Sequence, residues 1–163
     1  MITFKELLTE STNKFPRITW EEFLDIGSKS CGESLFSNGE NDDERIFKSE
    51  KDAKECYKQM IWTFQTLSNP ITIYRLIAVD DMQKINIKNP GSHWTYNESA
   101  LSFIRNNSLN GIGKHIVLLT GQINKKDVDW LSTIASYIVF SSDSYECEDE
   151  LYISHDDKII ECS

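Results

Sequence analysis

Short motifs of the common enzyme classes are missing from this 163-residue chain. It has no Gly-x-Ser-x-Gly segment, which disfavours a serine hydrolase. It has no Gly-x-Gly-x-x-Gly or Walker-type loop either, which disfavours doubly wound dinucleotide-binding and P-loop folds. Its four cysteines show no Cys-x-x-Cys spacing and no pairing with the three histidines, so no metal site is expected.

Long hydrophobic runs and an excess of basic residues are missing as well. No segment reaches the apolar length that spans a bilayer, and the first residues lack the basic-then-apolar order of a signal peptide. We therefore expect a cytoplasmic protein with reduced thiols. Acidic residues outnumber basic ones by 26 to 17, giving a net charge of −9. This charge disfavours nucleic acids and anionic membranes as partners and suits a basic protein or a small molecule.

The chain does contain enough apolar material for a core, with 39% hydrophobic residues. Its length fits a single domain over residues 1–163. Residues 1–70 are mainly helical by pattern, with the helices expected over residues 2–10, over residues 19–28 after a Thr19–Glu22 capping box, and from Ser49 to residue 67.

After Pro70 the hydrophobic period changes from about 3.6 to 2, which predicts a strand over residues 71–78. Helices are expected from Asn97 and from Asn124 or Asp127, and further strands over residues 84–88, 115–123, 150–153 and 158–162, the last two paired as a hairpin. Because helices come early and strands cluster late, the pattern predicts an α+β fold with residues 71–163 as its core.

Two charged features call for partners. Arg75 lies inside an apolar strand, where arginine is almost never buried unpaired, so we expect it to meet an acidic group or a ligand anion. Glu146, Glu148 and Glu150 alternate before the strand at residues 150–153, which places them on one face of an extended chain. Such a row either holds a cationic or hydroxyl-bearing ligand or forms a solvated acidic loop before an edge strand.

Three separated segments combine these features: Ile73-Tyr74-Arg75, a Gly-Ser-His-Trp-Thr strand start at residues 91–95 followed by a helix, and Glu148-Asp149-Glu150-Leu151. Their order and context resemble the mono-ADP-ribosyltransferases of the arginine–serine–glutamate class, which includes bacterial toxins and phage-encoded enzymes. The resemblance covers residues 71–162. It departs at the middle segment, where His93-Trp94-Thr95 replaces a serine–threonine–serine run.

This resemblance implies an ADP-ribosyltransferase-like fold, in which N-terminal helices precede a mixed, mainly antiparallel two-sheet core. It also implies NAD as substrate and a macromolecular acceptor, most simply a protein in the host cytosol if the chain is phage-encoded. Arg75 would grip the pyrophosphate, because a guanidinium offers two parallel donors. Glu150 would stabilise the positive charge that develops on the ribose as nicotinamide leaves. Glu148 would orient or deprotonate the acceptor, and a glutamate there resembles enzymes that modify arginine.

The remaining residues of the implied site have supporting roles. Thr95 would hold Glu150 or the nicotinamide ribose, or be an ordinary strand threonine, and His93 would hydrogen-bond a ribose or support the glutamate. The aromatic residues are expected beneath the cleft (Tyr74 and Trp94) and on the loop that meets the acceptor (Phe140 or Tyr145). An alternative register makes Glu146 and Glu148 the functional pair.

Three other functions remain open on these residues. The chain can be a non-enzymatic acidic binding or inhibitor protein on the same fold, or an NAD glycohydrolase that uses water as acceptor. It can also be an unrelated α+β domain in which Arg75 and the acidic stretch form a structural ion-pair cluster.

Overall fold

The structure, a computed structural model, describes residues 17–31, 35–36, 46–87, 91–107, 109–140, 149–153 and 159–162. Its first two helices are α2 (Trp20–Cys31) and α3 (Glu50–Thr66), which confirms both predictions. The Thr19 amide donates to the Glu22 carboxylate at 2.7 Å, and the Glu22 amide donates to the Thr19 hydroxyl at 3.2 Å. This reciprocal pair is the capping box expected from the sequence. The helix expected over residues 2–10 lies outside the described residues.

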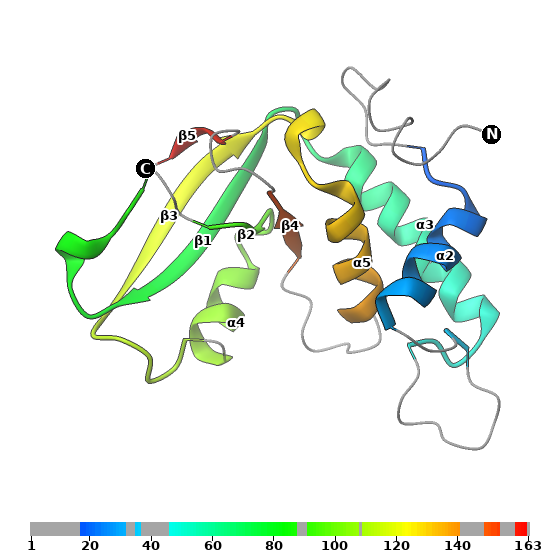
Figure 1. The fold of residues 1–163 in the computed structure, drawn as a ribbon, viewed down its shortest axis with the longest axis horizontal. Coiled ribbons are helices and arrows are strands. Elements are labelled where there is room, and N and C mark those ends of the chain that lie inside the picture. The colour runs from blue at the N-terminus through cyan, green and yellow to red at the C-terminus, as the bar shows by residue number, and fades with distance from the viewer. Residues whose placement is uncertain are drawn as a thin grey trace.

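One antiparallel sheet contains all five described strands, in the order β4-β2-β1-β3-β5 (Figure 1). They are β1 (Ile71–Val79), β2 (His93–Thr95), β3 (His115–Ile123), β4 (Glu150–Tyr152) and β5 (Ile159–Cys162). The α+β class and the antiparallel pairing are confirmed. The described residues form one sheet where two were predicted, because alternation identifies strands without fixing how many layers they make.

The predicted hairpin between the last two strands is wrong. β4 pairs with β2, and β5 pairs with β3, so the two strands lie at opposite edges of the sheet. The strand expected over residues 84–88 is wrong for residues 84–87, and residue 88 lies outside the described residues. The short 3₁₀ helix η2 (Met82–Lys84) runs into the start of this range, and the Asp81 carboxylate accepts a hydrogen bond from the Gln83 amide at 3.0 Å. An aspartate that caps its own turn competes with strand pairing.

The sheet has two unlike faces. Ile71 and Ile73 are buried on one of them, which we call the core face, in the same apolar cluster as Phe64 of α3 and Ile134 of α5 (Trp130–Phe140). Leu76 points to the other face by alternation, and α4 (Ala100–Asn107) packs over part of that face. We call it the α4 face. Figure 1 shows α2, α3 and α5 together at one end of the molecule and α4 against the sheet at the other.

Helix α5 covers the outer edge of β4. The Tyr152 amide donates to the Thr133 hydroxyl at 3.0 Å, and the Asp129 amide donates to the Tyr152 carbonyl at 2.8 Å. The helix begins later than predicted, because the 3₁₀ helix η3 (Lys125–Asp127) precedes it and Asp129 caps it. No helix in the described part of the chain is both long enough and apolar enough to cross a membrane.

Candidate functional site

The three segments singled out in the sequence contribute described residues to neighbouring strands. β2 lies between β1 and β4, and Thr95 pairs with Tyr74 on one side and Glu150 on the other. Cross-strand partners share a face, so Tyr74, Thr95 and Glu150 form one row on the α4 face. Two residues along on the same face, His93 pairs with Tyr152, and their rings lie 4.5 Å apart between centroids.

Glu150 occupies the β4 end of this row. Its side chain is half-buried, and the Ser136 hydroxyl of α5 donates to its Oε2 at 3.5 Å. A bond of that length is weak, so most of the acceptor capacity of the carboxylate is unused by the described residues. Among the described residues, the carboxylate is therefore directed by the strand and only weakly engaged by a hydrogen-bond donor.

The Thr95 hydroxyl serves the backbone rather than Glu150. It accepts from the Asn97 amide at 3.1 Å, and the Asn97 and Asp149 carbonyls, at 3.3 and 3.2 Å, share its single hydrogen as acceptors. The residue is only 2% exposed. The described hydrogen bonds thus match an ordinary structural threonine, and the predicted bond to Glu150 is not among them.

Asp149 is the residue of this region that sequence reasoning missed. Its carboxylate accepts from the Tyr96 hydroxyl at 3.0 Å and from the Asn97 side-chain amide at 2.6 Å, and its carbonyl accepts from the Tyr96 amide at 3.2 Å. Its backbone has φ of 48°, which aspartate tolerates better than most residues. Asp149 therefore ties the start of β4 to the segment after β2. The available signal was the aspartate itself, which the sequence places between Glu148 and Glu150 and to which the resemblance assigned no role.

Arg75 leaves the sheet on the core face, opposite to Glu150. It is the residue after Tyr74, and adjacent strand residues point to opposite faces. Its Nη1 donates to the His93 carbonyl at 3.0 Å. A Cβ at Gly91 would lie 2.5 Å from Nη1, and Gly91 has φ of +93°, so only glycine suits this turn. The guanidinium thus packs on the turn before β2, and the register does not bring it to the same face as Glu150.

The other predicted site residues are spread over the molecule. Trp94 is buried, and its indole donates to the Gly91 carbonyl at 2.8 Å, so it belongs to the core. Phe140 is 42% exposed at the end of α5. Glu148 and Tyr145 lie outside the described residues. Within the ranges that the structure describes, no three His, Cys, Asp or Glu side chains are grouped to hold a metal ion.

No protein-family model matches the chain, and no curated protein or solved structure is significantly similar to it.

Proposed function

We propose that this protein is an NAD-dependent mono-ADP-ribosyltransferase that modifies a protein acceptor, with Glu150 as its catalytic carboxylate. One observation carries the proposal: the three segments that resemble this enzyme class, far apart in the sequence, lie on the adjacent strands β1, β2 and β4. Because β2 lies between β1 and β4, its pairing with both strands places Tyr74, Thr95 and Glu150 side by side in one row. Functional groups on paired strands are held more rigidly than groups on loops.

The chemistry rests on the carboxylate of Glu150. Loss of nicotinamide leaves positive charge on the ribose, and a fixed carboxylate beside that sugar stabilises it. Glu150 suits this role because it is half-buried and only weakly engaged by Ser136. Glu148, two residues earlier, keeps its proposed role toward the acceptor. An acidic protein surface also suits an arginine side chain as the group to be modified.

Arg75 receives a different role from the one expected. Its bond to the His93 carbonyl fixes the start of β2, and β2 sets Thr95 opposite Glu150. We therefore propose Arg75 as a positioning residue for this row. A grip on the pyrophosphate from the face that carries Glu150 is not supported by the strand register.

A second candidate is a non-enzymatic acidic binding protein. It is favoured by the same placement of Arg75 and Glu150 on opposite faces, together with the commitment of the Thr95 hydroxyl to backbone groups. Groups that are already used in structural hydrogen bonds are not free to act on a substrate without rearrangement. The transferase requires turnover, whereas the binding protein does not.

The deciding experiment follows nicotinamide release and protein labelling with labelled NAD and a cell lysate. We compare the wild type, Glu150→Gln and the control Glu98→Gln, which changes an exposed glutamate outside the row. The transferase predicts labelled protein and a fall in turnover of about a hundredfold or more in Glu150→Gln alone, with NAD binding retained. Nicotinamide release without labelled protein identifies a glycohydrolase. Absence of both in the wild type overturns the enzymatic proposal.

A further inference from the structure

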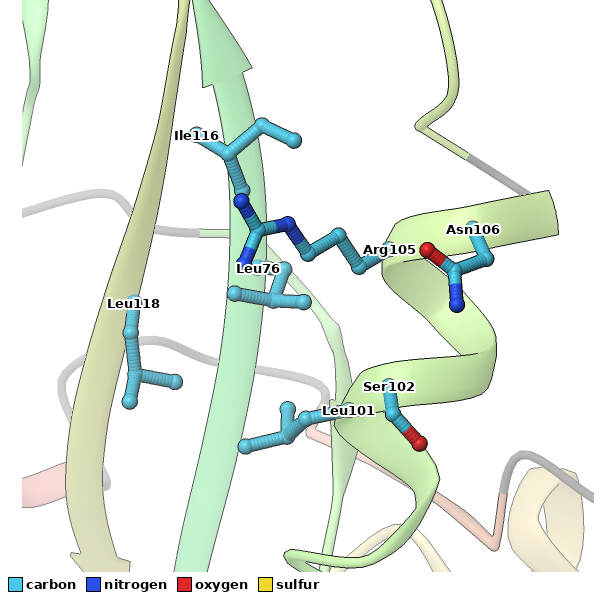
Figure 2. A pocket seen from close by; sticks show the side chains of 7 residues that line it. All are labelled: Leu76, Leu101, Ser102, Arg105, Asn106, Ile116 and Leu118. Carbon is cyan, nitrogen blue, oxygen red and sulfur yellow. The ribbon is translucent and has the colours of Figure 1, made fainter.

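An apolar groove lies between α4 and the sheet, on the α4 face. Its volume is about 480 Å³, and Figure 2 shows side chains from β1, β3 and α4 directed into it. The residues that line this α4 groove are Leu76, Leu101, Ser102, Arg105, Asn106, Ile116 and Leu118. The volume falls within the range of roughly 300–1,000 Å³ that is typical of small-molecule sites.

The strand side of the groove is a continuous apolar strip. Leu76 and Leu118 are cross-strand partners, and Ile116 lies two residues from Leu118 on the same face. Leu118 is 45% exposed and Ile116 is 38% exposed. Exposed aliphatic side chains that adjoin one another, rather than being scattered singly, indicate a surface that another molecule covers.

Among the residues that line the groove, Arg105 carries a positive charge. Figure 2 shows the Arg105 side chain reaching from α4 across the groove, with its guanidinium beside Ile116 and Leu76. The three ion pairs found within the described ranges all lie on α2 or α3, and none includes Arg105. Although the chain has a net charge of −9, the Arg105 guanidinium places a positive charge next to the apolar side chains of the groove.

We propose that the α4 groove binds a small amphiphile with an apolar body and one carboxylate. The aliphatic side chains of Leu76, Ile116 and Leu118 would bury the apolar body. Arg105 would donate two parallel hydrogen bonds to the carboxylate, an arrangement that suits a guanidinium better than any other side chain. The proposal is independent of NAD chemistry, although Tyr74 and Leu76 share a face, so such a ligand would lie beside the row that ends at Glu150.

Calorimetric titration with decanoate and with decanol tests this assignment. We compare the wild type with Arg105→Gln and with Arg17→Gln, a matched loss of one exposed guanidinium three residues before α2. Figure 1 shows α2 at a distance from α4. We expect Arg105→Gln to weaken decanoate binding about tenfold or more, the value of a charge-assisted hydrogen bond. Decanol binding to Arg105→Gln and decanoate binding to Arg17→Gln should stay at the wild-type level.

A second variant tests the apolar half. Leu118→Asp places a carboxylate on the strip and should abolish binding of both probes, while circular dichroism checks that the fold is kept. Amide chemical-shift changes in the wild type should map to α4, β1 and β3, which tests the location without any variant. The proposal is overturned if decanoate does not bind, if Arg105→Gln binds it as the wild type does, or if the shift changes lie outside these elements.

Discussion

Tyr57 of α3 shows how one part-buried polar group links stability to pH. Its hydroxyl donates to the Ile18 carbonyl at 2.7 Å, just before α2. Burial raises the pKa of the Tyr57 phenol above its ordinary 10.0, and the nearby carboxylates of Glu21 and Glu22 raise it further. The folded protein therefore holds this proton to higher pH than the unfolded chain does.

The consequence is a loss of stability in alkali. Below pH 10 the stabilisation is fully present, and it is lost as the pH rises from there through the raised pKa, because the unfolded chain releases the proton first. Tyr57→Phe should unfold about 1 kcal/mol more easily at pH 7 and lose less stability between pH 9 and 11. Urea denaturation of both proteins measures this. Burial lowers the pKa of the Lys125 amine, but this group is present in the wild type and in Tyr57→Phe, so its effect cancels when the stabilities of the two proteins are subtracted.

At the candidate site, the sequence predicted that the key residues lie on strands, but it did not predict the face of the sheet to which each side chain points. Arg75, Thr95 and Glu150 were all expected on strands, and all three lie on strands. Whether two of them share a face depends on the pairing register between distant segments, and a shift of one residue reverses the answer. That register comes from packing across the whole sheet, so local patterns did not contain it.

At the level of elements, local signals were reliable and distant pairing was not. The caps at Thr19 and Ser49 use side chains within three residues of the groups they bind, so sequence alone was sufficient to predict both helix starts. The hairpin of the last two strands was inferred from their closeness in sequence. β2 is only three residues long. Its partner on the edge side of the sheet is β4, which is far from it in the sequence.

Asp149 provides an element-scale prediction about how β4 is held. Asp149→Ala removes the acceptors of the Tyr96 hydroxyl and the Asn97 amide, and it places alanine at φ of 48°. We expect a loss of about 2 kcal/mol in the free energy of unfolding. Hydrogen exchange should show faster opening at Glu150 and Leu151, while β1 and β3 are unchanged.

The matched comparison for this prediction is Glu150→Gln, the next residue along. The only side-chain hydrogen bond of Glu150 within the described residues is the long bond from Ser136, so the stability of this variant should stay within about 0.5 kcal/mol of the wild type. If Glu150→Gln is destabilised as much as Asp149→Ala, the attachment of β4 does not depend on the Asp149 carboxylate.

For the molecule as a whole, Lys125 joins the helices to the sheet. It is 5% exposed just after β3, and its Nζ donates to the Phe64 and Gln65 carbonyls at the end of α3, at 3.1 and 3.2 Å. Its own amide donates to the Asn69 side chain at 2.9 Å. A buried ammonium is costly, which is why burial lowers its pKa, but these carbonyls partly offset that cost.

Lys125→Met tests this junction with nearly the same side-chain length. It leaves the two carbonyls without that donor, and we expect a loss of about 2 kcal/mol in the free energy of unfolding. Lys126→Met is the control, since Lys126 is exposed and its replacement should change stability by no more than about 0.5 kcal/mol. Equal stability of both variants in urea denaturation would mean that the Lys125 amine does not hold α3 to the sheet.

The sequence was sufficient to predict the α+β class of the molecule, but not the number of sheets in it. Helix signals before residue 70 and strand signals after it predicted the α+β class, and the described residues agree. The count of sheets depends on which strands find each other, and that is decided by burial of side chains such as Ile71, Ile123 and Trp94 in one shared core.

The cover that α5 gives to β4 has a consequence for self-association. An uncovered edge strand offers its amides and carbonyls to a strand of another molecule, and such pairing can propagate into fibrils. Here the Thr133 hydroxyl and the Asp129 amide already occupy the hydrogen-bonding positions of Tyr152. At Tyr152, these hydrogen bonds therefore prevent a strand of another molecule from pairing with the edge of β4.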